Sequence, residues 1–137
     1  MAVLLDPSAV VAAADASDLN HHAAAAWFER VDEPLLLGAL SLAELDVLLQ
    51  RDLGAAASAA VLESVVAGSI RLVAPTPDDL RRAAELMAEA SEHRPRLADA
   101  MLVATAERLG IRRVAAFDRR PLAVFRPRHL RSLDFEP

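Results

Sequence analysis

The hydrophobic residues of this chain fall into two kinds of run that alternate along its length. Short continuous apolar runs, bounded by Pro, Gly or Asp, are typical of strands covered on both faces of a sheet. We predict four such strands, at residues 2–5, 34–39, 70–74 and 112–117, and a short fifth one at residues 122–127. The intervals between these strands are long enough for one or two helices each.

The segments between the strands carry the signals of helices. Apolar residues recur there at spacings of three and four, and the segments begin and end with capping residues. Asp18 and Thr76 are predicted to cap helices at their starts, Pro7 suits a first turn, and Gly110 suits a helix end. The predicted helices cover residues 7–15, 19–31, 41–54, 55–68, 76–92 and 96–110.

Strands that alternate with helices predict an α/β fold with a mostly parallel sheet of four to five strands. At 137 residues the chain is long enough for one domain with a sizeable core, so we expect a single domain over residues 1–137. In sheets of this kind, ligands bind beyond the carboxyl ends of the strands.

Composition excludes several classes of site. The chain contains no cysteine, so disulfides and thiolate metal sites are ruled out. It contains no lysine either, which excludes mechanisms that need one, such as that of P-loop nucleotide hydrolases. No apolar run reaches the ~18 residues that a membrane span needs, so we expect no membrane association and a cytoplasmic protein.

Charge is distributed unevenly along the chain. The net charge is -5, but residues 1–68 carry -8 and residues 69–137 carry +3. Within residues 93–131, ten arginines stand against three acids, so this stretch is a candidate surface for an anionic ligand. Its candidate phosphate-binding arginines are Arg112, Arg119, Arg120, Arg126 and Arg128.

Four acidic residues occupy equivalent places in the predicted fold. Asp6 and Asp118 follow directly on apolar strands, whereas Glu44 and Asp99 are expected in the first turns of helices. This alternation is expected to bring all four to one edge of the sheet. Their negative charges would repel one another there, and a bound cation would offset that repulsion. Carboxylate oxygens suit Mg²⁺ or Mn²⁺, and the chemistry that uses such a site is metal-assisted phosphodiester hydrolysis.

Each acid also has a simpler interpretation. Asp6 is suited to cap the following helix, and Glu44 can complete a capping box in the sequence "SLAE". Asp99 can favour the helix dipole, and Asp118 can begin a turn. Ser8, two residues after the first acid, can hydrogen-bond a metal-bound water, although a bond to its own backbone is favoured. Because all four acids are expected at one edge of the sheet, we favour a shared metal site over four separate simpler roles.

Four segments of the chain resemble, in order and spacing, the motifs of PIN-domain ribonucleases. They are "LLDPSAVVA", "SLAELDVLL", "RLADAMLVATAERLG" and "VAAFDRRPLAVFRPRH", and the closest likeness is to VapC toxins of bacterial VapBC toxin–antitoxin systems. The resemblance implies a three-layer α/β/α sandwich. It also implies a catalytic, metal-binding quartet of Asp6, Glu44, Asp99 and Asp118, which would use Mg²⁺ or Mn²⁺ as the cofactor.

The same resemblance implies an endoribonuclease toxin that cleaves tRNA or ribosomal RNA. The partners would be the RNA substrate and a cognate VapB-type antitoxin that covers the site, in a homodimer that forms a heterotetramer or larger assembly. Ser8 would match the small polar residue after the first acid and, with the five arginines, is a candidate RNA contact. The chain departs from the family pattern at Pro7, Ala116 and Pro121.

Two other functions are consistent with parts of the sequence. A PIN-like domain that has lost its chemistry would serve as an adaptor for RNA or protein, and the altered loop around Pro121 motivates that hypothesis. A phosphotransfer domain of the haloacid-dehalogenase or response-regulator type also places an Asp after the first strand. Such domains need a lysine, which this chain lacks.

Overall fold

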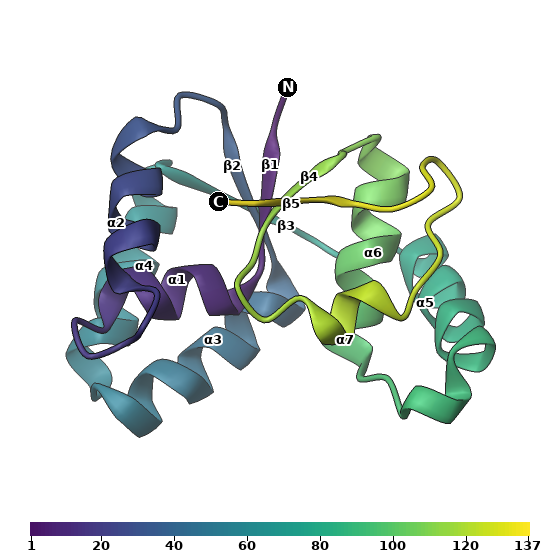
Figure 1. The fold of residues 1–137 in the computed structure, drawn as a ribbon, viewed down its shortest axis with the longest axis horizontal. Helices are drawn as coiled ribbons and strands as arrows, with labels where there is room; N and C mark the ends of the chain where they lie inside the picture. Colours follow the sequence, from purple (N-terminus) through teal and green to yellow (C-terminus); the bar gives the residue numbers. More distant parts are fainter.

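The computed structural model describes residues 1–137 as five strands and seven α-helices with one short 3₁₀ turn (Figure 1). The strands are β1 (Val3–Leu5), β2 (Leu35–Gly38), β3 (Ile70–Val73), β4 (Arg113–Ala115) and β5 (Asp134–Glu136). The helices are α1 (Pro7–Ala14), α2 (His21–Arg30), α3 (Ala39–Asp52), α4 (Ala55–Val66), α5 (Pro77–Glu89), η1 (Ser91–His93), α6 (Leu97–Leu109) and α7 (Arg120–Ala123).

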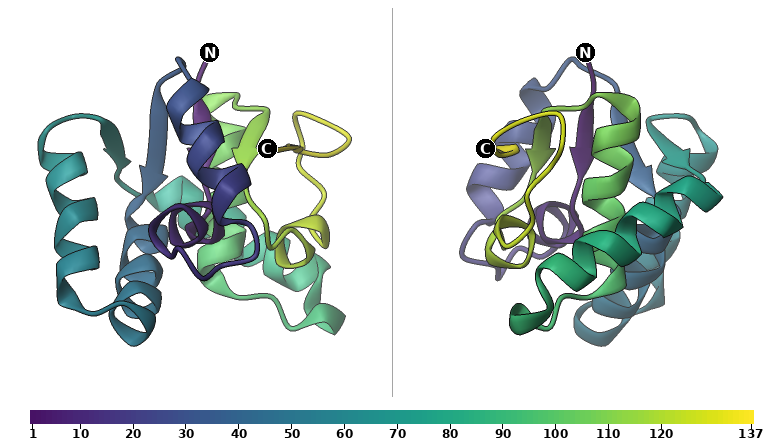
Figure 2. Two further views of the ribbon diagram at one scale, coloured as in Figure 1. Left: turned by 60° about the vertical axis from the view of Figure 1, so that its left-hand side comes forward. Right: turned by 90° about the vertical axis from the view of Figure 1, so that its right-hand side faces the viewer.

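The five strands form one sheet in the order β3-β2-β1-β4-β5, and every neighbouring pair is parallel. Helices α1 to α4 lie on one side of the sheet and α5 to α7 on the other, as Figures 1 and 2 show. The predicted three-layer α/β/α sandwich is therefore confirmed. Because all strands point the same way, their carboxyl ends share one edge of the sheet.

Alternation along the strands supplies both hydrophobic cores. Val3 and Leu5 of β1 face the core under α1 to α4, which also contains Trp27, whereas Leu4 between them faces the core under α5 to α7. All three β1 side chains are at most 1% exposed. Since successive strand residues point to opposite faces, a continuous apolar run is needed wherever helices cover both sides.

The predicted helix caps are correct at three positions and wrong at one. Thr76 and Asp79 form a reciprocal capping box, Pro7 opens α1, and Gly110 ends α6 in the left-handed conformation with φ 66°. Helix α2 begins later than expected, at His21, so Asp18 is not its cap. Asp18 instead accepts a hydrogen bond from the Asn20 N–H in the turn that precedes the helix.

Helix α3 starts two residues earlier than the sequence predicts. Gly38 is its N-cap, so Ser41 lies inside the helix and is buried. Glu44 consequently lies in the second turn, and the prediction of a first-turn position is wrong. The capping box in "SLAE" does not form, which removes the simpler explanation for Glu44.

The fifth strand is also not where the sequence placed it. Residues 122–127 form the end of α7 and the loop that follows, and Leu122 and Phe125 are buried three residues apart. That spacing is helical, whereas a strand would bury alternate residues. The actual fifth strand is β5, where Glu136 binds Arg113 of β4 through two charge-assisted hydrogen bonds of 2.7 and 2.8 Å.

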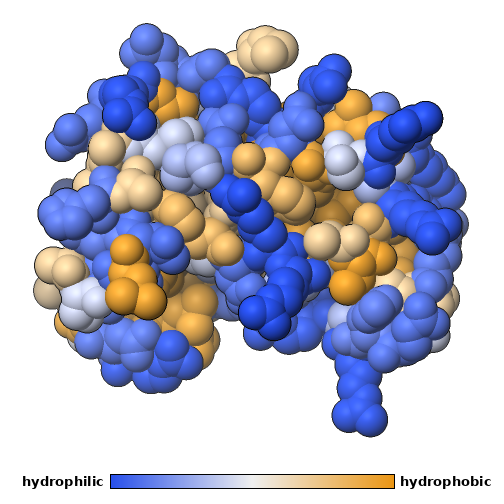
Figure 3. Space-filling view, viewed as in Figure 1, coloured by the Kyte–Doolittle hydropathy of each residue, from blue (hydrophilic) through white to orange (hydrophobic).

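No helix of the structure combines the length and apolar character that crossing a bilayer would require. Figure 3 shows a band of hydrophilic side chains running down the middle of the face seen in Figure 1, between apolar areas on either side. The band runs toward the end of the molecule where the strands have their carboxyl ends.

Candidate active site

A cleft of about 510 Å³ lies beyond the carboxyl ends of the strands and contains all four predicted acids. Asp6 follows β1, Glu44 comes from α3, Asp99 from the first turn of α6, and Asp118 from the loop after β4. We call this space the acidic cleft. It is also lined by Pro7, Ser8, Val11, Asp18, Asn20, Leu48, Arg51, Asp52, Arg96, Phe117 and Pro121.

Asp6 is buried at the floor of the acidic cleft, with 7% of its surface exposed. Its backbone N–H donates to the carbonyl of Ala115, which fixes it beside β4. Burial raises the pKa of the Asp6 carboxyl from 3.8 to about 6, hydrogen bonds from Ser8 oppose that rise, and the negative charges of Asp99 and Glu44 add to it. Asp6 is also the N-cap of α1, so the capping interpretation is confirmed, and the same side chain lines the acidic cleft.

Ser8 connects Asp6 to the loop that carries Asp118. Its hydroxyl donates to Asp6 Oδ2 at 2.5 Å and accepts from the backbone N–H groups of Phe117 and Asp118 at 3.0 and 3.2 Å. One donor and two acceptor positions exhaust the capacity of a hydroxyl, so Ser8 has none left for RNA. The structure therefore gives Ser8 a positioning role inside the site.

Replacing Ser8 with alanine is expected to lower the free energy of unfolding by about 1 to 2 kcal/mol, because it leaves polar groups of the cleft without partners. Ser17→Ala is the matched control. Ser17 makes the same two contacts with Asp15, at 2.9 and 2.7 Å, but on the exposed surface. Urea denaturation of both variants measures the difference, and equal losses would contradict the positioning role of Ser8.

Asp99 and Glu44 face each other across the cleft with an arginine between them. Arg96 Nη2 lies 3.1 Å from Glu44 Oε1, and Arg96 Nε lies 3.5 Å from Asp99 Oδ2. Burial raises the pKa of Asp99, the positive charge of Arg96 opposes that rise, and the charges of Glu44 and Asp118 reinforce it. The acids are thus close enough to repel one another, as the sequence predicted, but part of the compensating charge comes from the chain itself.

The donor chemistry of the acidic cleft fits a hard divalent cation. All four acids offer carboxylate oxygens, which Mg²⁺ and Mn²⁺ prefer, and no thiolate or imidazole lines the cleft. In this structure no three acidic or histidine side chains are drawn together tightly enough to hold a metal ion. The guanidinium of Arg96 stands between two of the four instead.

None of the five predicted arginines lines the acidic cleft. Arg112 precedes β4, at the amino ends of the strands, and pairs with Asp134. Arg119 donates to the carbonyls of Ala116 and Pro137. These contacts hold both arginines away from the cleft.

Two further arginines lie on the side of α5. Arg128 pairs with Glu85 at 2.7 Å. Arg126 lines a separate cavity of about 370 Å³ together with Glu89 and Glu92. Of the positive stretch, Arg108 and Arg128 pair with acids of α5, so the stretch does not form one continuous surface.

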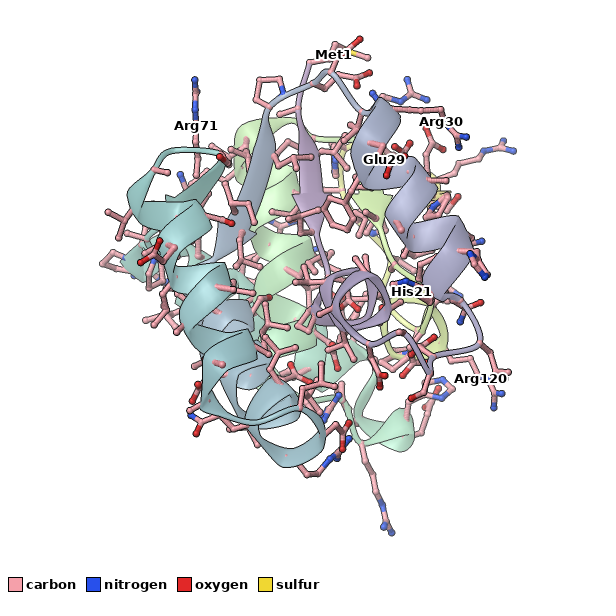
Figure 4. All side chains as sticks on the ribbon, turned by 90° about the vertical axis from the view of Figure 1, so that its left-hand side faces the viewer. Met1, His21, Glu29, Arg30, Arg71 and Arg120 are labelled. Atoms are coloured by element: carbon pink, nitrogen blue, oxygen red, sulfur yellow. The ribbon has the colours of Figure 1, made fainter.

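Among the five, Arg120 is adjacent in sequence to a residue of the acidic cleft. It is exposed, forms no ion pair or hydrogen bond, and precedes Pro121, which lines the acidic cleft. Figure 4 shows Arg120 at the surface, in the half of the molecule that lies away from Met1.

Two arginines of the acidic cleft were missed by the sequence reasoning. Arg51, near the end of α3, lines the cleft and pairs with Asp52. Arg96 could have been found, because it lies three residues before Asp99 and the two therefore share a helical face. Its contact with Glu44 spans more than fifty residues of sequence and follows from the packing of α6 beside α3.

Comparison with known proteins shows that the chain that forms this cleft is similar to one protein family. A family model of the PIN domain matches residues 3–126, which include all four acids. Ribonuclease VapC26 of Mycobacterium tuberculosis is 29% identical over 125 residues, covering 91% of this chain and 93% of that protein.

Solved structures show the same fold. VapC20 of Mycobacterium tuberculosis, described as a sarcin–ricin loop cleaving toxin, superposes with a TM-score of 0.82 at 25% identity over 94% of this chain and 98% of that one. VapBC2 of Rickettsia felis, bound to a DNA fragment from their promoter, superposes with a TM-score of 0.70 at 11% identity over 100% of both chains.

Proposed function

The chain belongs to the PIN domain family, and we propose that it is a divalent-metal-dependent endoribonuclease that acts as the toxin of a toxin–antitoxin pair. The observation that carries this proposal is the convergence of Asp6, Glu44, Asp99 and Asp118 from four separate elements on one cleft. The similarity to a protein named ribonuclease VapC26 supports nuclease activity. We also propose that residues 1–137 act as one PIN domain.

The four acids would hold Mg²⁺ or Mn²⁺, and each has a defined support in the fold. A bound divalent cation polarises a phosphoryl oxygen and activates a water molecule for attack. Asp6 and Asp118 are held in register by the hydroxyl of Ser8, which contacts the carboxylate of one and the backbone of the other. Arg120, which is exposed, unpaired and next to Pro121 of the cleft, would bind a flanking RNA phosphate.

The proposed substrate is tRNA or ribosomal RNA, and the proposed partner is an antitoxin that covers the acidic cleft. The structural neighbours include a toxin described as cleaving the sarcin–ricin loop and a VapBC complex, and these descriptions support both parts of the proposal. We further propose a homodimer that the antitoxin joins into a larger complex.

The test uses the purified chain, free of antitoxin, with total RNA from a bacterial cell. We expect new RNA 5′ ends in 5 mM Mg²⁺ or Mn²⁺ and none in excess EDTA, because metal removal takes away the group that polarises the phosphate. Mapping the 5′ ends by sequencing identifies the target. Cleavage that persists in EDTA would contradict metal dependence.

The adaptor alternative predicts a different outcome from the same experiment. A PIN-like domain without chemistry would bind RNA or protein but would create no new 5′ ends at any metal concentration. Pro121, which motivated that alternative, lies in the first turn of α7, where its missing N–H leaves no helical hydrogen bond unmade. The altered residue is therefore compatible with the loop that carries Asp118.

A further inference from the structure

Arg96 joins two of the proposed metal ligands that come from different helices. It is the N-cap residue of α6, and its guanidinium lies 3.1 Å from Glu44 on α3 and 3.5 Å from Asp99 on α6. The other arginine of the acidic cleft, Arg51, pairs with its neighbour Asp52 and contacts none of the four acids. Arg96 is therefore the side-chain cation that pairs with members of the acidic quartet, Glu44 and Asp99.

The contacts of Arg96 allow another cation to displace its guanidinium from Glu44 and Asp99. Its side chain is 65% exposed, whereas the side chains of Glu44 and Asp99 are 23% and 8% exposed. Ion pairs with an exposed partner contribute little to stability, and a long arginine side chain has many other conformations available. Arginine does not lose its proton in proteins, so this cation leaves by displacement rather than by titration.

A divalent cation bound by Glu44 and Asp99 would compete with the guanidinium directly. Both cations need the same carboxylate oxygens, and two positive groups a few ångströms apart repel each other. The backbone of Arg96 is held by its place before α6, so a displaced guanidinium would stay within reach of the cleft. An arginine released there can bind a phosphate through two parallel hydrogen bonds.

We propose that Arg96 is a displaceable counter-ion of the acidic cleft: without metal it bridges Glu44 and Asp99, and metal binding releases it to contact an RNA phosphate. This inference rests on the proposed function, because it takes the quartet to be the metal site. Arg96 would then compete with the metal for Glu44 and Asp99 and, once displaced, bind the substrate.

The first test measures Mn²⁺ affinity of the full chain by isothermal titration calorimetry. Arg96→Ala is expected to bind Mn²⁺ about three- to tenfold more tightly than the wild type, because two ion pairs no longer compete. Arg51→Ala is the matched control, since Arg51 lines the same cleft with the same 65% exposure. We expect less than a twofold change for the control, so a general charge effect is separated from bridging.

Arg96→Lys gives a second variant that keeps the charge. Arg96 makes no side-chain capping hydrogen bond, so neither substitution removes a helix cap. Lysine lacks the forked guanidinium that reaches both carboxylates, so its Mn²⁺ affinity should fall between those of the wild type and Arg96→Ala. Affinity unchanged or weaker in Arg96→Ala would overturn the inference.

The second test follows the side chain itself. In a Mg²⁺ titration monitored by NMR, the Nε–Hε resonance of Arg96, identified by its absence in Arg96→Ala, is expected to move, and that of Arg51 to stay. Arg96→Ala should also raise the KM for RNA at saturating metal while changing kcat less. An Arg96 resonance that does not respond to Mg²⁺ would show that the ion pairs persist and would overturn the proposal.

Failure of this inference is distinguishable from failure of the proposed function. If the wild type binds Mn²⁺ and cleaves RNA but Arg96→Ala leaves metal affinity unchanged, only the role of Arg96 is wrong. If neither the wild type nor Arg96→Ala binds Mn²⁺, the metal site and the inference are both wrong.

Discussion

Replacing Asp99 with asparagine is expected to lower the rate of RNA cleavage at least about 100-fold while leaving the chain folded. Asp99 is a proposed metal ligand, and loss of even an outer-sphere partner of a metal site typically lowers activity by about 10- to 100-fold. Asparagine has nearly the same shape but carries no charge, and the site of Asp99 is buried, so neutralising it should not weaken the fold.

Asp78→Asn is the matched control for this prediction. Asp78 also lies in the first turn of a helix and also pairs with an arginine three residues away, at 2.5 Å, but it is 84% exposed on α5. Single-turnover cleavage of the mapped RNA should be lost in Asp99→Asn and retained in Asp78→Asn. Cleavage by Asp99→Asn at the wild-type rate would remove Asp99 from the site.

The second large effect concerns stability. Asp6→Asn is expected to raise the free energy of unfolding by about 1 to 3 kcal/mol at pH 7.5 without metal, even though it should abolish cleavage. In the folded protein the pKa of Asp6 is about 6, whereas in the unfolded chain it is near 3.8. Between pH 3.8 and 6 this carboxyl binds fewer protons in the unfolded chain than in the folded protein. Its contribution to the free energy of unfolding therefore falls as the pH rises.

Asparagine should keep the local contacts of Asp6. Both hydrogen bonds from Ser8 go to one carboxylate oxygen, Oδ2, and the single oxygen of an asparagine side chain can accept both. Asparagine is also as good an N-cap as aspartate. The gain in stability therefore comes from removing a buried charge, and it should shrink to a small fraction near pH 4, where Asp6 is protonated in the folded state and partly protonated in the unfolded chain.

Asp15→Asn is the control, because Asp15 makes the same pair of contacts with Ser17 on the surface. Its effect on unfolding should stay within about 0.5 kcal/mol at both pH values. Urea denaturation at pH 4.0 and 7.5 in EDTA measures the differences. A loss of stability in Asp6→Asn at pH 7.5 would contradict the interpretation that the buried charge of Asp6 lowers the free energy of unfolding.

Strands β1 to β4 and their direction followed from sequence because their cause is local, whereas the fifth strand predicted at residues 122–127 was wrong. Runs such as "AVLL" are apolar at every position, and only burial on both faces of a sheet satisfies such a run in a short segment. Errors occurred at the starts of helices, such as those of α2 and α3. Asp18 and Ser41 are good capping residues, but packing of the helices against the sheet selected Asn20 and Gly38 instead.

The four acids could be predicted together for a related reason. Once the sheet is parallel, every strand end and the start of most following helices meet at one edge, so chain order alone places Asp6, Glu44, Asp99 and Asp118 near one another. Their charge balance could not be predicted. The sequence indicated a missing cation, whereas the structure shows that Arg96 already supplies part of the positive charge.

The arginines show where prediction from sequence ends for this protein. The ten arginines within residues 93–131 form one cluster in the sequence. In the structure, however, Arg112 lies at the amino ends of the strands, away from the acids, and Arg128 pairs with Glu85 of α5. Which face a long charged side chain reaches depends on contacts between segments far apart in the chain.

The sequence by itself determined the class of fold, the edge of the sheet that carries the acids and the identity of those acids, because strand burial and chain direction are encoded in short segments. Only the tertiary structure decided that Ser8 ties Asp6 to the loop of Asp118 and that Arg96 bridges Glu44 and Asp99. Both are contacts between side chains or backbone groups of different elements, and their geometry exists only after the helices have packed against the sheet.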